Sequence, residues 1–375
     1  MIPFNKPYLT GNETRYIEDA VASGKISGNG KYTQLCQDFF EKKYGFGKCL
    51  LTTSCTDALE MAAILIDIKP GDEVIIPSYT FVSTANAFVL RGAKIIFADS
   101  NPYNPNLDVA HLESLISNKT KAIVPVHYAG VACDMDAIME IANNHGIYVI
   151  EDAAQAIDSF YIGKNGIKKA LGSIGHLAAF SFHETKNIIS GEGGMLVIND
   201  AQFANRAEII WEKGTNRSAY FRGDVDKYGW IDIGSSFLPS EIIAAFLWAQ
   251  LQCLDNIQSR RKVIWQRYYD GLNIENKKVS LPFLPSFATN NAHIFYLVFD
   301  SLENRTTCIQ NLKNHHFQAV FHYLSLHESP FYKNKHSGKK LIYCNEYSNR
   351  LLRLPMFYEL GLDQVDEIIK IINNA

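Results

Sequence analysis

Lys186 has the surroundings of a reactive amine. The apolar run 177–180 predicts a buried strand, and SFHETKN at 181–187 leads from it toward a glycine turn at 191–194. An amine held in a site of low dielectric constant loses part of its preference for the charged form and becomes a nucleophile toward carbonyls. Lys186 is therefore a candidate for the Schiff-base lysine that pyridoxal 5'-phosphate (PLP) requires. The alternative is an ordinary lysine at the end of a strand.

PLP makes three further demands, because its phosphate needs donors, its pyridine nitrogen needs an acid and its ring needs a flat apolar neighbour. The segment 52–59 (TTSCTDAL) follows the first predicted strand and opens a helix. A helix N-terminus offers unpaired N–H groups and the positive end of a dipole, so it can bind a phosphate, and the Thr56 hydroxyl can add a bond. The alternative is plain N-capping by Ser54 or Thr56.

Asp152, in YVIEDAAQ at 148–155, is the candidate acid. A carboxylate at the end of a buried strand is costly unless it is paired, and a protonated pyridine would pair it. Glu151 points to the opposite face of the strand, so only one of the two acids can have this role. We assign the role to Asp152, which precedes two small alanines, and the alternative is an N-cap for the next turn.

Phe81, in PSYTFVSTAN at 77–86, is the candidate ring neighbour, although aromatic residues between a strand and a helix often belong to the core. Ser181 lies near enough to Lys186 in the sequence to contact the phosphate. The order of the signals carries the hypothesis: a phosphate loop, an aromatic loop, Asp152 at one strand end, Ser181 at another, and then Lys186.

The elements that would position these residues alternate along the first two thirds of the chain. Short apolar runs predict seven strands at 49–51, 74–76, 94–97, 122–126, 148–150, 177–181 and 195–198. Helix patterns lie between several of them, at 57–66, 84–90 and 135–144. Buried strands separated by helices indicate a sheet covered on both faces, hence an α/β fold.

The last third of the chain predicts a smaller domain. An amphipathic stretch at 239–269, with a break around 253–257, leads to a strand at 291–299 and helices at 302–314 and 362–374. We expect an N-terminal arm at 1–12, a large cofactor-binding domain at 13–250 and a small α+β domain at 251–375.

Composition excludes several other classes of protein. The 375 residues are 47% hydrophobic and 20% charged, with a net charge of -3, which gives no electrostatic case for binding nucleic acid or a membrane surface. The N-terminus lacks a signal-peptide pattern and no apolar stretch reaches a membrane span, so we expect a cytoplasmic protein. The seven cysteines form no CxxC pair and the histidines no HExxH, so we expect no metal site.

Taken together, these residues resemble the DegT/DnrJ/EryC1/StrS sugar aminotransferases over essentially the whole chain. The matching segments are 71–78 (GDEVIIPS), 126–130 (VHYAG), 151–155 (EDAAQ), 181–194, 322–327 and Leu354-Pro355. The resemblance implies the aspartate aminotransferase-like fold of type I PLP enzymes, with a mainly parallel seven-stranded sheet. One branch of the family replaces the catalytic lysine by histidine and performs dehydration, and Lys186 argues against that branch.

The resemblance implies a role for each matching residue. Lys186 binds PLP covalently and then shuttles the proton between substrate and cofactor, and Asp152 binds the pyridine nitrogen. Other residues contact the cofactor: Phe81 stacks on the ring, Gln155 lies near the phenolic oxygen, and Thr56, Ser181 and the backbone of Cys55 and Asp57 hold the phosphate. A further phosphate contact comes from the neighbouring subunit in this family, and Ser236 stands where asparagine is common.

The resemblance also implies the reaction. The segments 78–94, 182–187 and 212–218 are most similar to enzymes that move the amino group of L-glutamate to C4 of dTDP-4-keto-6-deoxy-D-glucose. The expected products are dTDP-4-amino-4,6-dideoxy-D-galactose and 2-oxoglutarate, for lipopolysaccharide O-antigen or enterobacterial common antigen. The gluco epimer and 3-amination of a dTDP-3-keto sugar remain alternatives.

Two substrates must share one pocket, and both are anions. Arg217, Lys227, His322, Tyr323 and His327 are candidate substrate-binding residues, with surface charge or loop hydrogen bonding as the alternative. The resemblance implies a homodimer with shared active sites, and 214–236 is the predicted crossing segment. The rival classes are an NAD-dependent oxidoreductase and a non-enzymatic nucleotide-sugar binder. The first lacks its motif, because Gly28-Asn29-Gly30 precedes every predicted strand and has no third glycine.

Overall fold

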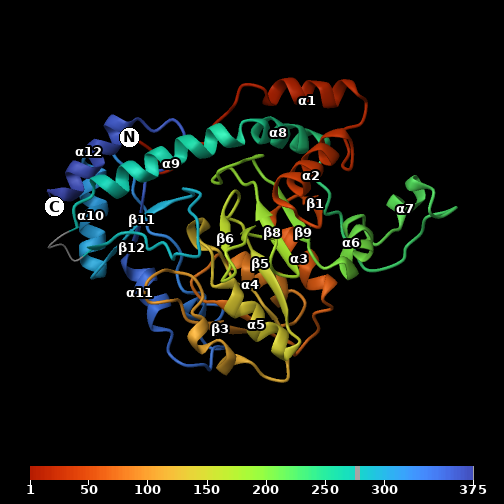
Figure 1. The fold of residues 1–375 in the computed structure, drawn as a ribbon, viewed down its shortest axis with the longest axis horizontal. Coiled ribbons are helices and arrows are strands. Elements are labelled where there is room, and N and C mark those ends of the chain that lie inside the picture. The colour runs from red at the N-terminus through yellow and green to blue at the C-terminus, as the bar shows by residue number, and fades with distance from the viewer. Residues whose placement is uncertain (275–278, 375) are drawn as a thin grey trace.

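A seven-stranded sheet forms the centre of the structure, a computed structural model that describes residues 1–274 and 279–374 (Figure 1). The strand order is β1-β9-β8-β5-β4-β2-β3, and only β9 runs antiparallel to its neighbours. The strands are β1 (Lys48–Thr52), β2 (Glu73–Pro77), β3 (Lys94–Ala98), β4 (Thr120–Ile123), β5 (Tyr148–Asp152), β8 (Leu177–Ser181) and β9 (Gly194–Ile198). The seven predicted strands and the mainly parallel sheet are therefore confirmed.

Helices cover both faces of this sheet, as its continuous apolar strands require. Leu50 and Leu51 are neighbours in β1, yet they join two different hydrophobic cores, because successive side chains point to opposite faces. One core includes residues of α3 (Cys55–Leu65), α4 (Val82–Val89) and α6 (Ala204–Trp211). The other includes residues of α2 (Lys31–Tyr44), α5 (Met135–His145) and α8 (Glu241–Gln252).

Three smaller features complete this part of the chain. Helix α1 (Glu13–Ala22) packs along α8, and a hairpin of β6 (Phe160–Ile162) and β7 (Lys168–Ala170) follows β5. Helix α7 (Arg217–Arg222) lies on a segment that projects from the body of the molecule beyond α6 (Figure 1).

The C-terminal third has a sheet and a core of its own. Helix α9 (Leu254–Gly271) leads away from the large sheet after a break at Cys253, as predicted. The small sheet contains β10 (Val279–Ser280), β11 (Phe295–Phe299) and β12 (Leu351–Leu354), with helices α10 (Leu302–Asn314), α11 (Ile342–Arg350) and α12 (Leu362–Asn373) around it. A third hydrophobic core is drawn from residues between Ile264 and Ile372, which supports the proposed division into a large and a small domain.

The N-terminal residues lie against this C-terminal part. Ile2 bridges to Phe317, and the Phe4 carbonyl accepts a hydrogen bond from the Met356 backbone N–H at 3.0 Å. The chain therefore starts against the small domain and then crosses to the large domain, where α1 begins. Within the described residues, no helix combines the length and apolar character needed to cross a bilayer.

Candidate active site

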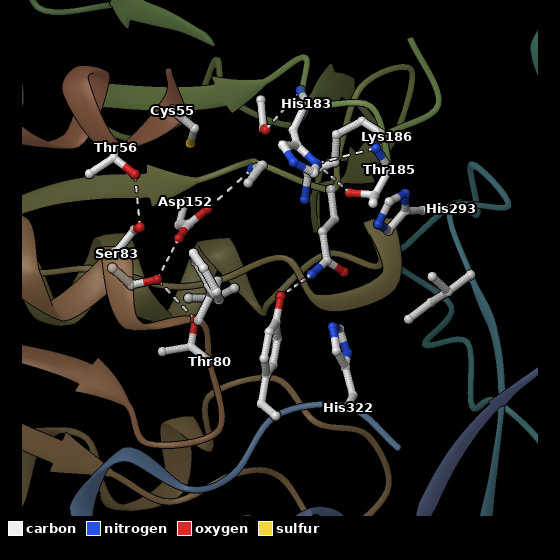
Figure 2. A pocket seen from close by; sticks show the side chains of 18 of the residues that line it. Cys55, Thr56, Thr80, Ser83, Asp152, His183, Thr185, Lys186, His293 and His322 are labelled. Carbon is white, nitrogen blue, oxygen red and sulfur yellow. Dashed lines mark hydrogen bonds between the residues drawn. The ribbon is translucent and has the colours of Figure 1, made fainter. Parts of the chain in front are cut away.

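A pocket of about 640 Å³ lies where the carboxyl ends of β5 and β8 meet the C-terminal part of the chain. In open α/β sheets, ligands bind beyond the carboxyl ends of the strands. The pocket is walled by the starts of α3 and α4, the loop between β8 and β9, and the segments around His293, His322 and Arg353. Figure 2 shows Lys186 and Asp152 from the large domain facing the same cavity as His293 and His322.

Lys186 is presented by the loop between β8 and β9. The Lys186 backbone N–H bonds to the His183 carbonyl at 2.9 Å, and the Phe182 backbone N–H donates to the Gly193 carbonyl at 2.8 Å, which closes the base of the loop. Burial lowers the pKa of the Lys186 amine, although the nearby Cys55 and Asp152 side chains act in the opposite direction. A lowered pKa increases the fraction of neutral, nucleophilic amine.

Asp152 is buried at the end of β5 with both carboxylate oxygens engaged. Oδ2 accepts a hydrogen bond from the Thr84 hydroxyl at 2.7 Å, and Oδ1 accepts one from the Ala154 backbone N–H at 3.1 Å. Burial raises the pKa of this carboxyl, against the effect of those hydrogen bonds and of the Lys186 charge. The carboxylate therefore caps the following turn, which was the alternative, and also faces the pocket.

Glu151 lies on the other face of the sheet, as strand alternation predicts. Its oxygens lie 2.9 Å from His127 Nε2 and accept hydrogen bonds from the backbone N–H groups of Gly172, Ile174 and Gly175 at 2.6–2.7 Å. These contacts account for a fully buried acid without any ligand. Glu151 is absent from the pocket wall.

The N-terminus of α3 forms a second polar wall. Ser54 caps the helix, as the alternative interpretation has it, because its hydroxyl accepts a hydrogen bond from the Asp57 backbone N–H at 3.1 Å. The Asp57 N–H is thus already bonded, and its carboxylate is held by Thr53 and Ser54. The first-turn N–H groups of Cys55 and Thr56 have no partner within the helix and lie beside the pocket.

Three hydroxyls complete that wall. The Thr56 hydroxyl lies 2.8 Å from that of Ser83 (Figure 2). Ser181 lines the same pocket. Gly194 lets β9 approach closely, since a Cβ there would lie 2.3 Å from the Ser54 carbonyl carbon. Together, the hydroxyls and helix N–H groups make a cradle for an anion.

Phe81 and Gln155 lie in the pocket wall. The Phe81 side chain is largely exposed and its ring centre is 6.1 Å from that of Tyr323. Gln155 accepts the Ala129 backbone N–H at 2.7 Å and donates to the Tyr323 hydroxyl at 3.0 Å. Phe81 therefore presents a free aromatic face instead of joining the core.

His322 and Tyr323 reach the pocket from the small domain. Their rings stack with centres 3.6 Å apart, and His322 Nδ1 lies 2.6 Å from the Tyr128 hydroxyl. Burial and the Arg353 charge hold the pKa of His322 well below its usual range, so the ring is neutral. These two candidate substrate-binding residues are thus brought to the site.

His327 is not brought to the pocket. The ring is buried, its Nδ1 lies 2.7 Å from the Ser78 hydroxyl, and its Nε2 lies 3.4 Å from Glu328. The loop after Tyr323 turns back against the end of β2, where the Leu326 backbone N–H bonds to the Ser78 carbonyl at 2.9 Å. Its position indicates a structural anchor for that loop and does not support the predicted contact with substrate.

Arg217 and Lys227 lie between α6 and α8, Ser236 bridges back to Glu212 at the end of α6, and all three are absent from the wall of the pocket. Arg217 is 3.8 Å from Glu212. The segment between α6 and α8 also exposes large apolar side chains, including Phe221 (69%) and Trp230 (85%). The contacts of Arg217 and Lys227 with substrate, and of Ser236 with the phosphate, therefore stay predictions.

Several residues that line the pocket were not predicted from the sequence. Ser83 and Thr84 belong to the same segment as Phe81, so the prediction for Phe81 could have been extended to them. His293 had no signal in the sequence: its Nδ1 lies 2.8 Å from the Asn187 Oδ1, and burial together with the Lys186 charge holds its pKa well below the usual range. Arg353 interrupts the apolar strand β12, which was a readable signal.

The described residues offer no cluster of three or more histidine, cysteine or acidic side chains suited to a metal ion. A buried lysine, a buried acid and a helix N-terminus facing one cavity define instead the cofactor site of a type I PLP-dependent enzyme. The family model of the DegT/DnrJ/EryC1/StrS aminotransferase family matches residues 7–373, and the chain belongs to this family.

Relatives and solved structures agree. The chain is 32% identical to the spore coat polysaccharide biosynthesis protein SpsC of Bacillus subtilis, covering 100% of this chain and 96% of the relative. The aminotransferase TlmJ from Streptoalloteichus hindustanus is 28% identical with a TM-score of 0.89, covering 100% and 98%. The putative sugar aminotransferase Spr1654 from Streptococcus pneumoniae, in its PLP form, is 25% identical with a TM-score of 0.89, covering 100% and 98%.

The protein is therefore a sugar aminotransferase that uses PLP, and the pocket fits this cofactor. The α3 cradle matches a phosphate, and Asp152 offers a buried carboxylate for a protonated ring nitrogen. Lys186 offers an amine of lowered pKa, and Phe81 offers an aromatic face.

Proposed function

We propose that this enzyme transfers the amino group of L-glutamate to C4 of dTDP-4-keto-6-deoxy-D-glucose, releasing 2-oxoglutarate and dTDP-4-amino-4,6-dideoxy-D-galactose. The observation that supports the chemistry best is the placement of Lys186 and Asp152 in one pocket with the N-terminus of α3. The choice of sugar rests on the sequence segments 78–94, 182–187 and 212–218. The gluco epimer and a 3-amino product remain the alternatives.

PLP, when bound, supplies an electron sink and carries the amino group between the two substrates. The Lys186 Nζ would hold the cofactor and move a proton to and from the reacting carbon. The Asp152 carboxylate would keep a proton on the ring nitrogen, and the hydrogen bond that it accepts from the Thr84 hydroxyl orients it for that task. Asp152 is thus proposed to sustain the electron sink while Lys186 acts as the acid and base.

The remaining contacts with PLP follow the geometry of the pocket. Thr56, Ser181 and the backbone of Cys55 would bind the phosphate. Ser83, whose hydroxyl contacts that of Thr56, would be an additional donor to it. Gln155 would lie near the phenolic oxygen and Phe81 against the ring. Asp57 would contribute mainly by holding the loop, because its own N–H and carboxylate already have partners.

Both substrates would use the same pocket in turn, in a ping-pong reaction. His322 and Tyr323 line it from the small domain and offer a neutral ring and a hydroxyl, which suit a sugar better than a second fixed charge would. SpsC, by its name, belongs to polysaccharide biosynthesis, which supports a role for the product in a surface polysaccharide.

We also propose a homodimer in which the segment 214–236 of each subunit reaches the partner's pocket. The segment projects from the body of the chain and exposes Phe221 and Trp230, which a monomer would leave in water. Arg217 and Lys227 would then contact the anionic groups of a substrate across the interface, and Ser236 would add a bond to the phosphate.

The test is a reaction with a defined sugar. Purified protein is incubated with PLP, L-glutamate and dTDP-4-keto-6-deoxy-D-glucose, and the product is examined by NMR. An axial amine at C4 is expected for the galacto product. An equatorial amine would refute the stereochemistry, and turnover only with a 3-keto isomer would refute the position of amination.

A further inference from the structure

His293 lies in the wall of the pocket just before β11, and it takes no part in the proposed contacts with PLP. The residue is buried, and Figure 2 shows its ring facing the same cavity as Lys186. The His293 backbone is held on both sides, because its N–H donates to Asn291 Oδ1 at 3.0 Å and its carbonyl accepts from the Arg261 guanidinium at 2.6 Å. The ring therefore has a fixed place in the wall.

Asn187, the residue that follows Lys186, determines which ring nitrogen of His293 carries the proton. Asn187 Nδ2 donates to the Asn291 backbone carbonyl at 2.9 Å and to Gln258 Oε1 at 2.8 Å. A backbone carbonyl can only accept, so the nitrogen of the Asn187 amide must face it, and Oδ1 is left to face the His293 ring. Oδ1 lies 2.8 Å from His293 Nδ1, which must therefore be the protonated nitrogen.

The same arrangement leaves His293 Nε2 as an acceptor. Burial and the Lys186 charge hold the pKa of the ring well below its usual range, and a neutral imidazole carries only one proton. Within the described part of the chain, the hydrogen bonds of His293 use its backbone and Nδ1, and they leave Nε2 free. Because Asn187 lies outside the pocket wall, Nδ1 faces away from the cavity and the opposite edge of the ring, with Nε2, faces it.

An unprotonated nitrogen beside Lys186 discriminates between the two proposed substrates. The carboxylates of L-glutamate and 2-oxoglutarate can only accept hydrogen bonds, so Nε2 offers them nothing. The keto sugar instead carries a hydroxyl on the carbon next to its carbonyl, and a hydroxyl can donate. Leaving an acceptor unpaired in a filled pocket costs free energy, which favours the ligand that supplies the donor.

We infer that His293 Nε2 accepts a hydrogen bond from the sugar hydroxyl next to the reacting carbonyl, which is the C3 hydroxyl for amination at C4. Asn187 is the positioning residue that keeps the proton on Nδ1 and Nε2 unprotonated. The inference rests on the proposed function and deepens it: His293 favours the hydroxylated ketone over 2-oxoglutarate, which competes for the same aminated form of the enzyme.

The two half-reactions test this contact. Holoenzymes of the wild type, His293→Asn and His293→Gln are first mixed with L-glutamate, and the loss of PLP absorption is followed. After the amino acid is removed, the keto sugar is added and the return of the absorption is followed. The second-order rate constant with the sugar should fall at least about fivefold in His293→Asn, which keeps a donor near Nδ1 and has no acceptor near Nε2. His293→Gln, whose longer amide can place an oxygen near Nε2, should retain part of the rate, and the glutamate step should change less than about twofold in both.

A sugar without the hydroxyl identifies the partner of Nε2. With dTDP-4-keto-3,6-dideoxy-D-glucose, which lacks the C3 hydroxyl, the wild type should react at least about fivefold more slowly than with the full sugar. His293→Asn should lose little further rate with this substrate, because the contact is already absent. Additive losses would show that His293 and the C3 hydroxyl act independently, which would overturn the inference.

Nitrogen NMR of histidine-labelled holoenzyme reads the protonation of the ring without turnover, and His293→Asn identifies the signals of His293. The wild type should show a protonated Nδ1 and an unprotonated Nε2 at neutral pH. Asn187→Leu should shift these signals toward the form protonated at Nε2, because Nδ1 loses its acceptor. A wild-type ring protonated at Nε2 would overturn the inference, whatever the rates show.

His315→Asn is the matched control, since His315 Nδ1 also bonds to an oxygen, the Asn311 carbonyl at 2.9 Å, but on the exposed end of α10. Its rates should equal those of the wild type. A slower glutamate step with an unchanged sugar step in His293→Asn would assign the ring to the amino donor, and equal losses in both steps, or none, would also contradict the inference. Failure of the wild-type holoenzyme to react with L-glutamate would instead overturn the proposed function.

Discussion

Glu151 and Asp152 are neighbours in β5, yet their carboxylates lie on opposite faces of the sheet and have different partners. Glu151 is saturated by His127 and three backbone N–H groups, whereas Asp152 faces the pocket beneath Thr84. One acid stabilises the fold and the other is available to the cofactor. This division of roles follows from the alternation of side chains along a strand.

Substitution of the two acids should therefore give different defects. Asp152→Asn removes the negative charge facing the ring nitrogen, and we expect kcat to fall at least about tenfold with little change in melting temperature. Glu151→Gln should instead lower the stability by about 1–3 kcal/mol, because buried donors lose their acceptor, while the folded enzyme keeps its turnover. Steady-state kinetics and thermal melts of both variants check this.

Thr84→Val is the graded control, since it removes one hydrogen bond to Asp152 and leaves the carboxylate in place. Its kcat should lie between those of the wild type and Asp152→Asn. Equal losses of kcat in the Asp152 and Glu151 variants would contradict the assignment.

Acid should destabilise the protein through its buried neutral histidines. Burial holds the pKa of His293 well below its usual range, so below about pH 6.5 the unfolded chain binds a proton that the folded one does not. This contribution is absent above that pH and destabilises the folded protein increasingly as the pH falls below it. The melting temperature should therefore fall less in His293→Gln than in the wild type between pH 7.0 and 5.5.

His145→Gln is the control for this measurement, because His145 is exposed and paired with Glu113 at 3.1 Å on the surface. Its acid response should equal that of the wild type. A His293→Gln protein with an unchanged response to acid would show that His293 titrates normally.

The proposed homodimer with shared active sites predicts complementation between inactive subunits. We expect both Lys186→Ala and the double variant Arg217→Ala/Lys227→Ala to be nearly inactive alone. If the projecting segment acts on the partner's pocket, an equal mixture of the two after subunit exchange should recover about one quarter of wild-type activity. Half of the dimers are then mixed, and each has one intact site.

The activity of the mixture is compared with that of each variant alone. A second control is a mixture that is assayed before the subunits have exchanged. Activity that stays at the sum of the two variants would place the projecting segment in its own subunit's site. Full activity of the double variant alone would remove both cations from the mechanism.

Sequence patterns predicted the large domain well because its strands are short apolar runs buried on both faces. Ser54 as a cap, the break at Cys253 and the opposite faces of Glu151 and Asp152 all follow from local geometry. The small domain was harder to read: β12 carries Arg353 within an apolar run, and α11 has few buried residues.

The site divides in the same way. Lys186, Asp152 and the N-terminus of α3 are local signals at strand ends, and they meet because parallel strands end at one edge of the sheet. His293 and Arg353 reach the pocket only through the packing of a second domain. Arg353 stands out in the sequence as a charge within an apolar run, but the run does not show which cavity it faces, and His293 has no such signal. His327 was a candidate substrate-binding residue, but its loop folds against Ser78 instead.

The most direct test of the account is the colour of the holoenzyme through one complete cycle. Wild-type protein with PLP should lose its visible absorption on addition of L-glutamate and regain it on addition of dTDP-4-keto-6-deoxy-D-glucose. Lys186→Ala should lack the wild-type absorption band, and its absorption should change neither with L-glutamate nor with the keto sugar. Lys169→Ala, at an exposed lysine on β7, should match the wild type. A wild-type protein that stays colourless with PLP, or whose band does not respond to L-glutamate, would contradict it.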